Sequence, residues 1–322
     1  MREMTYVEAL NEAFMEEMAR DDTVVVYGED AEVSFTFQAT KGLLEKFGPE
    51  RVRDTPICEN LLVGAGVGAA IGGLRPVVDM TFCDFLPLAM DQIVNQAAKA
   101  RYMSGGQVRV PLVINAAIGH LGSWAAHHSQ CLQALFAHVP GLRVVLPSTP
   151  YDVKGLMKTA IRSDDPVVFL EHKLLFKTKG EVPDGEYTIP FGRADVKRRG
   201  RHVTIVAISY MVLEALKAAE ALSAEGIEAC VIDPRTLAPL DHATIIESVK
   251  ETGRLLVVDE AAKSFGAGAE IVARVCELAF DCLDAPVQRL GVPDVPIPQS
   301  GPLEREVIPN VQSIVAAVKR VC

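Results

Sequence analysis

The stretch Asp54-Thr55-Pro56-Ile57-Cys58-Glu59 leads directly into Gly64-Ala65-Gly66-Val67-Gly68-Ala69-Ala70-Ile71-Gly72-Gly73. The run that ends near Ile57 predicts a strand, and the glycine- and alanine-rich run predicts a helix that begins near Asn60. A helix with so few large side chains can approach a sheet, or a facing copy of itself, closely. Ligands of open α/β folds lie at the carboxyl ends of strands, so the turn makes Glu59 a candidate site residue.

Strand and helix patterns alternate on both sides of this turn. Short β-rich runs are predicted at 24–27, 52–57, 76–81, 112–116, 144–147 and 167–170. Helical patterns lie between them at 65–72, 88–103, 129–137 and 150–161, and Thr5-Tyr6-Val7-Glu8 has the pattern of a capping box that opens a further helix. This alternation is typical of a parallel sheet with helices on both faces.

The segment 177–200 differs in composition, being rich in glycine, proline and charge. We interpret it as a linker that carries an edge hairpin. A second α/β set follows, with strands predicted at 203–208, 229–232, 255–258 and 287–291. The expected fold is therefore α/β with two doubly wound domains, at residues 1–176 and 201–322.

Composition excludes several classes of protein. A chain of 322 residues can bury two cores, and 49% hydrophobic with 23% charged residues is typical of a globular protein. The net charge is −10, and the short run Lys197-Arg198-Arg199-Gly200-Arg201 is the main basic cluster, so nucleic acid is not expected as a partner. No apolar run reaches the length of a membrane span, so no membrane partner is expected either.

The cysteines indicate a reducing compartment. There are seven, none in a Cys-x-x-Cys pair, and several lie in apolar runs. The segment Met1-Arg2-Glu3-Met4-Thr5 has no signal or transit character, which together with the cysteines predicts a cytoplasmic location.

Several runs together carry a family resemblance. Residues 54–79 resemble the beta subunit of the thiamine-diphosphate-dependent first component of 2-oxoacid dehydrogenase complexes. Three further runs match the same family: Met90-Asp91-Gln92-Ile93-Val94-Asn95-Gln96-Ala97-Ala98-Lys99, Tyr102-Met103-Ser104-Gly105-Gly106 and Ala126-His127-His128-Ser129-Gln130. The similarity continues through Pro140-Gly141-Leu142-Arg143-Val144-Val145 into the last third of the chain. It implies a thiamine-pyrimidine-binding domain followed by a domain of the transketolase C-terminal type.

The resemblance implies a role for Glu59. In this family a glutamate binds the pyrimidine ring of the cofactor and activates it by sharing a proton, which is acid–base chemistry carried out through a cofactor. Phe85 matches an aromatic residue that packs on the pyrimidine, and Ile57 an apolar residue that lines the same ring. Alone, Glu59 reads as an acid favoured by a helix N-terminus, and Phe85 and Ile57 as core residues. Asp79 stands where relatives carry glutamate, and Leu88 where a polar residue is more usual.

His128 is the second candidate catalytic residue. The resemblance places this histidine in the active-site channel, where it orients the substrate-derived intermediate or the incoming lipoyl group. Here His127 replaces the family's glutamine, which gives a pair of adjacent histidines. The pair has no carboxylate or cysteine beside it in the sequence, so metal binding is the weaker reading. His120 lies in a preceding glycine-rich loop and is a further candidate for the channel.

Two cations follow from the resemblance. Structural potassium would be bound, largely by backbone carbonyls, at the matching positions Leu112, Ala160, Ile161, Ser163 and Asp165. The Mg²⁺ that holds the diphosphate in thiamine enzymes is bound by a Gly-Asp-Gly motif, which this chain lacks. A nucleotide-binding role for the glycines at 64, 66 and 68 is also not expected: Ala69 takes the place of the third glycine of the dinucleotide-binding fingerprint, so close helix packing explains the run better. An alpha subunit is therefore expected to hold the Mg²⁺ diphosphate in an α2β2 heterotetramer.

Three functions remain open at this point. The first is the beta subunit of a thiamine-diphosphate-dependent pyruvate-type 2-oxoacid or acetoin dehydrogenase that passes the acyl unit to a lipoyl group on a dihydrolipoyl acyltransferase core. The second is the C-terminal half of a split transketolase. The third is a non-catalytic assembly subunit in which Glu59 is structural.

Overall fold

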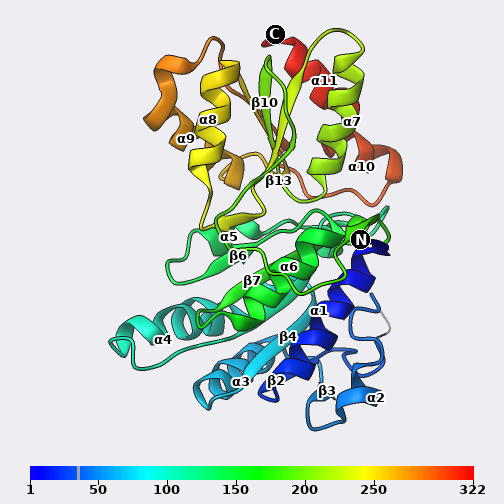
Figure 1. Ribbon diagram of the computed structural model, residues 1–322, viewed down its shortest axis with the longest axis vertical. Coiled ribbons are helices and arrows are strands. Elements are labelled where there is room, and N and C mark those ends of the chain that lie inside the picture. Colours follow the sequence, from blue (N-terminus) through cyan, green and yellow to red (C-terminus); the bar gives the residue numbers. More distant parts are fainter. Residues whose placement is uncertain (35–36) are drawn as a thin grey trace. The chain divides into compact units, whose positions relative to one another are not determined.

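Two sets of strands and helices, each with its own core, make up the protein (Figure 1). The structure is a computed structural model that describes residues 1–34 and 37–322. The first unit comprises Met1–Ile118 and Leu135–Phe191, and the second comprises Gly119–Ala134 and Gly192–Cys322. The expected linker at 177–200 thus straddles the division between the units, and the segment 119–134 belongs to the second unit despite its place in the sequence.

The first unit contains these elements in chain order: β1 (Arg2–Thr5), α1 (Tyr6–Arg20), β2 (Val24–Gly28), α2 (Leu43–Phe47), β3 (Val52–Asp54), α3 (Glu59–Ile71), β4 (Arg75–Phe82), η1 (Cys83–Ala89), η2 (Asp91–Ala97), α4 (Ala98–Met103), β5 (Val113–Ile118), β6 (Arg143–Val145), α6 (Pro150–Arg162), β7 (Val167–His172), η4 (Lys173–Leu175) and β8 (Lys179–Val182). The short helix α5 (Gln133–Ala137) lies across the division between the units.

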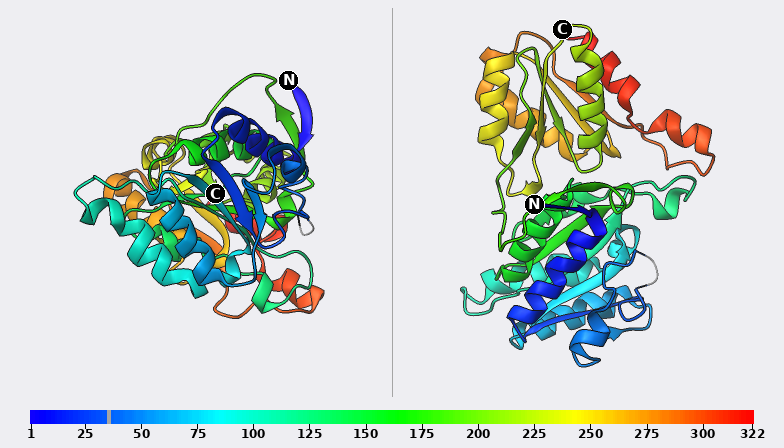
Figure 2. Two further views of the ribbon diagram at one scale, coloured as in Figure 1. Left: turned by 90° about the horizontal axis from the view of Figure 1, so that it is seen from below. Right: turned by 45° about the vertical axis from the view of Figure 1, so that its right-hand side comes forward.

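Parallel strands of the first unit lie in the order β6-β7-β5-β4-β2-β3. The order reverses around β2, because β3 lies on one side of it and β4 on the other, as in a doubly wound sheet. Helices α1 and α6 pack together on one face of the sheet, while α3 and α4 cover the other (Figure 1, Figure 2). The capping box at the start of α1 is formed, with Thr5 accepting from the Glu8 amide and Glu8 accepting from the Thr5 amide.

Helix α3 approaches the sheet closely at one glycine. A Cβ on Gly66 would lie 2.9 Å from side-chain carbons of Val78 and Leu112, and 3.0 Å from the Tyr27 hydroxyl oxygen. Gly68, on the outer face of the same helix, would meet nothing within 4 Å. The close packing predicted from the glycine-rich run is therefore confirmed at Gly66, and it fixes where the helix N-terminus lies.

The second unit contains η3 (Ala126–His128), β9 (Asp195–Arg198), β10 (Val203–Ala207), α7 (Met211–Ser223), β11 (Ala229–Asp233), β12 (Thr236–Ala238), α8 (His242–Thr252), β13 (Leu255–Ala262), α9 (Ala267–Ala279), η5 (Phe280–Cys282), β14 (Gln288–Val292), α10 (Gly301–Val307) and α11 (Val311–Lys319). Its sheet has the order β14-β13-β10-β11-β9, in which only β9 is antiparallel to its neighbour. Helices α7 and α11 cover one face, and α8 and α9 the other (Figure 1, Figure 2).

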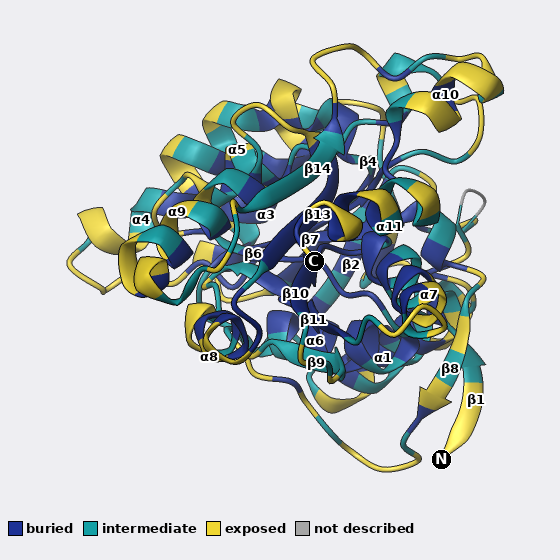
Figure 3. Ribbon diagram, turned by 90° about the horizontal axis from the view of Figure 1, so that it is seen from above, coloured by how far each residue is buried: buried dark blue, intermediate teal, exposed yellow. Residues whose placement is uncertain are grey.

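Each sheet is the centre of a buried core. The central strands of both sheets are dark blue in Figure 3, whereas the edge strands β9 and β14, the outer faces of the helices and the β1–β8 ribbon are largely teal or yellow. In the second unit, apolar residues of β10, β11 and β13 pack against α7 and α11. The two doubly wound α/β arrangements confirm the expected fold class.

Some sequence-based boundaries are wrong. The hairpin expected within 177–200 does not form, because β8 pairs with β1 and β9 pairs with β11, each in an antiparallel manner. The helix expected at 129–137 begins only at Gln133, since the preceding loop carries a short helical turn, η3. Helical propensity alone does not show where a loop turns back to meet another element.

Candidate functional site

Glu59 is the first residue of α3, and its position follows from the turn after β3. The β3 strand ends at Asp54, and the Thr55 amide donates to the Gly28 carbonyl at 3.0 Å, which ties the turn to the end of β2. The side chain of Glu59 is half-buried at the helix N-terminus, where the helix dipole favours negative charge. The structure therefore places this carboxylate at the carboxyl edge of the first sheet.

Phe85 lies on the element that packs beside this helix. It belongs to η1, which contacts α3, and its half-buried ring meets Phe82 edge-on with the centroids 6.2 Å apart. Phe82 in turn packs edge-on against Phe37 at 5.7 Å. A register shift in β4 between Asp79 and Phe82, with Thr81 at a φ of +55°, turns the chain into η1. Phe85 thus lies on the segment that follows this irregularity and that packs against α3.

Ile57 is largely exposed, with 76% of its surface accessible, and Leu61 and Leu88 are also exposed apolar residues of the first unit. Exposed apolar side chains beside a half-buried carboxylate indicate an incomplete pocket rather than a closed one. The structure thus brings Glu59, Ile57 and Phe85 onto two adjoining elements, α3 with its leading turn and η1.

Three acidic side chains lie on neighbouring strands at the same edge, of which Glu171 is buried and Glu29 and Asp79 are half-buried; the sequence analysis named only Asp79. Glu29 follows β2, Asp79 lies within β4 and Glu171 within β7. Gly28 is the register partner of Asp79, which sets Glu29 beside the strand that carries Asp79. For Glu29 and Glu171 a signal is present in the sequence, since each acid lies at or just after the carboxyl end of a strand, whereas Asp79 lies in the middle of β4.

Burial raises the pKa of each of these three acids. It raises the pKa of Asp79 to about 6, although the Thr81 amide, which donates to Asp79 Oδ1 at 2.9 Å, opposes the shift. Burial also raises the pKa of Glu171 well above its usual range. For Glu29, burial raises the pKa first and the charges of Glu59 and Asp79 raise it further. The cluster therefore carries less negative charge near neutral pH than its composition suggests.

His128 lies in the second unit, in the turn η3. Its half-buried ring meets Trp124 edge-on at 6.2 Å, and its amide donates to the Ala125 carbonyl at 3.4 Å. The turn is held by backbone at positive φ, +64° at Ser123 and +61° at Ala125, and the Ser123 amide donates to the Glu304 carboxylate. The conformation of this loop is thus fixed locally within the second unit.

His127 and His120 differ in their surroundings. His127 is exposed, whereas His120 is bound by Glu260, whose Oε1 accepts from the His120 amide at 2.7 Å and lies 2.9 Å from its Nδ1. The His120 ring also meets Tyr210 edge-on at 6.1 Å. His120 is therefore held by hydrogen bonds to Glu260, which its place in a glycine-rich loop did not indicate.

The residues expected to bind potassium gather around the carboxyl end of α6. Arg75 lies among them, and its Nη1 donates to the carbonyls of Ile161 and Ser163, each at 3.0 Å. The Ala160 carbonyl accepts from the Ser163 amide at 3.1 Å, and the Leu112 carbonyl accepts from the Val167 amide at 2.8 Å.

The acidic side chains of this turn are also paired with arginines. The Asp165 carboxylate bonds to Arg101 and Arg143, and Arg75 Nη2 bonds to Asp164 at 2.9 Å. The expected ligand atoms are oxygens, as potassium prefers. However, the Arg75 guanidinium already donates hydrogen bonds to two of the expected carbonyls and places positive charge beside them.

Family models cover both units. The model of the transketolase pyrimidine binding domain matches residues 2–179, and that of the transketolase C-terminal domain matches residues 192–314. Pyruvate dehydrogenase E1 component subunit beta-1 of Oryza sativa subsp. japonica, a mitochondrial protein, is 49% identical over 326 residues, covering 100% of this chain and 87% of the relative. The chain belongs to the family of 2-oxoacid and acetoin dehydrogenase beta subunits.

Other members of the family are similar to a comparable degree. The beta subunit of acetoin:2,6-dichlorophenolindophenol oxidoreductase of Cupriavidus necator is 47% identical, covering 99% of this chain and 97% of the relative. The 2-oxoisovalerate dehydrogenase beta subunit of Bacillus subtilis is 45% identical, covering 99% and 98%. Beta subunits named for different substrates thus resemble this one about equally.

The solved structure of a split-gene transketolase, described as an inactive beta4 tetramer, has a TM-score of 0.81 at 26% identity and covers 99% of this chain and 98% of that chain. The family and the two-domain fold implied by the sequence are therefore confirmed. Within the described residues, no helix combines the length and apolar character of a membrane span.

Proposed function

We propose that this beta subunit forms the pyrimidine-binding half of a thiamine-diphosphate enzyme that decarboxylates a pyruvate-type 2-oxoacid or cleaves acetoin. The observation that carries the proposal is the position of Glu59: a half-buried carboxylate, at the first residue of α3, beside an acid whose own pKa it raises. The full-length similarity to beta subunits named for pyruvate, acetoin and 2-oxoisovalerate supports it.

The residues present fit the pyrimidine part of the cofactor. Glu59 offers a carboxylate to a ring nitrogen, Phe85 offers an aromatic face, and the exposed Ile57 offers an apolar edge. When bound, thiamine diphosphate supplies the nucleophilic carbon that attacks the substrate carbonyl. Glu59 holds or releases a proton at the ring nitrogen, and the packing of α3 through Gly66 keeps its carboxylate in place.

Glu29 tunes this site. Because its pKa is raised, Glu29 keeps its proton to a higher pH than an exposed glutamate does, which limits the repulsion that Glu59 experiences.

The partners proposed are an alpha subunit, in an α2β2 heterotetramer, and a dihydrolipoyl acyltransferase core that carries the lipoyl acceptor. The alpha subunit supplies the Mg²⁺ diphosphate site, since this chain has no Gly-Asp-Gly motif. His128 orients the substrate-derived intermediate or the lipoyl group. We propose a cytoplasmic or other reducing compartment, because all seven cysteines are free thiols.

For potassium we propose only a weak requirement. Arg75 already donates to the carbonyls of Ile161 and Ser163, so a bound ion adds less stabilisation there than it does to unpaired carbonyls. The remaining oxygens at Leu112, Ala160 and Asp165 still offer lone pairs to a cation.

The proposal is tested with the subunit co-expressed with its alpha partner. Glu59→Gln is compared with wild type and with Glu50→Gln, a control at an exposed glutamate. The assay is thiamine-dependent reduction of an artificial electron acceptor with pyruvate, acetoin or a branched 2-oxoacid as donor. We expect Glu59→Gln to lower kcat by about 10²–10⁴-fold without loss of assembly, and Glu50→Gln to behave as wild type.

Two results would contradict the proposal. Full activity of assembled Glu59→Gln would make this carboxylate structural and favour a non-catalytic assembly subunit. Activity of the wild type with sugar phosphates, but with none of the three donors, would favour the split-transketolase function instead.

A further inference from the structure

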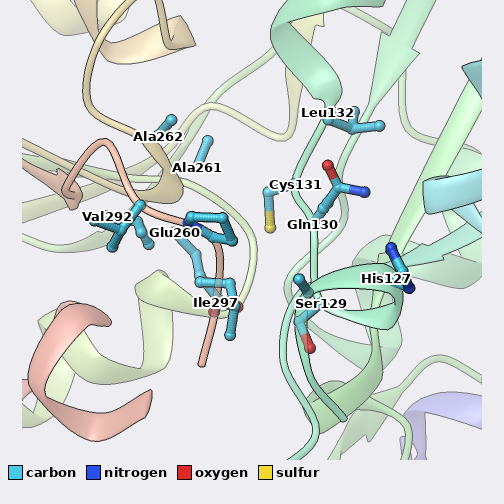
Figure 4. Close-up of a pocket in the computed structure, with 13 residues that line it drawn as sticks. His127, Ser129, Gln130, Cys131, Leu132, Glu260, Ala261, Ala262, Val292 and Ile297 are labelled. Carbon is cyan, nitrogen blue, oxygen red and sulfur yellow. The ribbon is translucent and has the colours of Figure 1, made fainter. Parts of the chain in front are cut away.

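The segment 119–134, which carries His128, is held at three points by the second unit to which it belongs. Each point is a buried carboxylate: Glu260 binds His120, Glu304 binds Ser123 and Asp259 binds Gln133. Part of the segment does not lie against packed side chains, because a cavity of ≈ 320 Å³ separates the loop that includes His127 from the chain that includes Glu260 and Ile297 (Figure 4). The conformation around His128 therefore depends on the anchors of this segment.

The Glu304 anchor lies where the backbone of the segment is strained. Both oxygens of the Glu304 carboxylate accept from the Ser123 amide, at 3.2 and 3.1 Å. Ser123 has a φ of +64° and Ala125 a φ of +61°, which are unfavourable for residues with a side chain and persist only where the surroundings hold them. A hydrogen bond to an ionised carboxylate is among the strongest that a backbone amide makes. The contact with Glu304 is therefore suited to hold this strained turn.

The strained residues also contact His128. Trp124 follows Ser123 in the chain and meets the His128 ring edge-on, with the ring centroids 6.2 Å apart. The Ala125 carbonyl accepts from the His128 amide at 3.4 Å. A change in the backbone at Ser123 therefore moves Trp124 and Ala125, and each of these residues contacts His128. Through these contacts the Glu304 carboxylate influences the direction of the His128 ring.

Helix α10 buries one side chain, and that side chain is Glu304. Among the residues of this helix only Glu304 is buried, whereas the apolar Leu303 is 57% exposed. Ile297 before the helix and Ile308 after it belong to the core of the second unit, so the chain is fixed on both sides of Glu304. Burying a carboxylate is unfavourable unless it is hydrogen-bonded. We therefore attribute the burial of Glu304 to its contact with Ser123.

We propose that Glu304 is a positioning residue for His128. Its carboxylate holds the backbone at Ser123 and thereby sets the direction of the His128 ring through Trp124 and Ala125. The inference rests on the proposed function, in which His128 orients the substrate-derived intermediate or the lipoyl group. Glu304 acts on an amide of this chain and not on the substrate, so its removal should impair the step that His128 serves while the subunit stays folded.

Trp124 provides the first test, because it is the single tryptophan of the chain and its fluorescence can be measured in the full-length subunit. A protonated imidazole beside an indole quenches the emission, and histidines titrate between about pH 5 and 8. We expect the wild-type emission to fall as the pH is lowered through this range, and most of the fall to be lost in His128→Gln. Glu304→Leu keeps bulk but has no acceptor for the Ser123 amide, and should reduce the response about twofold or more.

Two further variants separate positioning from stability. Glu304→Gln keeps an oxygen that accepts from the Ser123 amide and should retain more of the response than Glu304→Leu. Glu306→Leu changes an exposed position of the same helix and should match the wild type. Urea unfolding of each variant shows whether the subunit is folded. If Glu304→Leu does not fold, Glu304→Gln decides alone, because its weaker, uncharged bond predicts a response between those of the wild type and His128→Gln.

Activity provides the second test, with the alpha partner present and a lipoyl domain as acceptor. We expect Glu304→Leu to lower kcat by about 10–10²-fold, as a small misplacement of a catalytic group does. In a His128→Gln background the same change should add little further loss, since both substitutions then affect one group. A purely structural role of Glu304 would give the same loss in both backgrounds.

Either of two results would overturn the inference: a wild-type fluorescence response in folded variants of Glu304, or equal losses of activity from Glu304→Leu in the wild-type and His128→Gln backgrounds. Failure of the proposed function is seen differently, as full activity of His128→Gln. In that case the fluorescence comparison still decides whether Glu304 positions the His128 ring.

Discussion

Gly28 and Asp79 are register partners in β2 and β4, and they lie so close that a Cβ on Gly28 would be 2.1 Å from the Asp79 carbonyl oxygen. No side chain fits at this distance without a backbone movement. Glu29 directly follows Gly28, and Glu29 and Asp79 are two of the acidic side chains at this edge of the sheet. The close contact between Gly28 and Asp79 therefore sets the spacing between these two acids.

Replacing this glycine should therefore damage both stability and activity. We expect Gly28→Ala to destabilise the first unit by about 1–3 kcal/mol, as overpacking of a tight contact does. The free energy of unfolding, from urea titration of the isolated chain, measures the first effect, and the assay of the reconstituted enzyme measures the second. Wild-type stability in Gly28→Ala would mean that the two strands separate at little cost.

Two glycines of one helix should respond in opposite directions. Gly66→Ala places a Cβ 2.9 Å from Val78 and Leu112 and should destabilise the isolated chain, whereas Gly68→Ala meets nothing within 4 Å and should stabilise it by about 0.5–1 kcal/mol. Urea midpoints of the two variants provide the comparison, each serving as the control of the other. Equal effects of the two changes would show that helix α3 does not depend on the close approach at Gly66.

The buried carboxyl group of Asp79 should make stability depend on pH. Its pKa of about 6 in the folded chain lies above the ordinary value of 3.8, so the protonated form is the one that folding favours. The corresponding stabilisation is fully present below about pH 4 and is lost as the pH rises through 6. A difference of about two pH units corresponds to at most about 3 kcal/mol.

Asp79→Asn removes this titration and keeps an acceptor for the Thr81 amide. We expect the variant to gain stability relative to wild type as the pH rises from 4 to 7, with no further gain above 7. Urea unfolding at a series of pH values checks this, with the exposed Asp281→Asn as control. A flat difference across the series would mean that Asp79 titrates as an exposed acid does.

Arg75 should largely substitute for potassium at the end of α6. We expect the melting temperature of the wild type to differ little between KCl and tetramethylammonium chloride. Arg75→Gln removes the donors to Ile161 and Ser163 and should lower stability, with KCl restoring part of the loss. Arg109→Gln is the matched control, since Arg109 pairs with Asp164 at 2.9 Å but donates to neither carbonyl in the described contacts. A strong potassium requirement in the wild type would contradict this expectation.

The sequence by itself determined the fold class, the family and the position of Glu59. Local signals are sufficient for the fold class and for Glu59, because the strand, the turn and the glycine-rich helix are each specified by consecutive residues. The family follows from several motifs that occur in order along the chain. The same holds for the capping box at Thr5 and Glu8, whose partners are three residues apart.

Only the tertiary structure decided which distant residues share an environment. Asp79 and Glu171 lie on β4 and β7, on either side of β5, and burial first and then the charge of Asp79 raise the pKa of Glu171. The segment 119–134 belongs to the second unit although it is embedded in the sequence of the first. Likewise, Arg75 met the carbonyls of Ile161 and Ser163 across some 86–88 positions of sequence. Burial and long-range contacts depend on how elements pack, and no local pattern of residues carries that information.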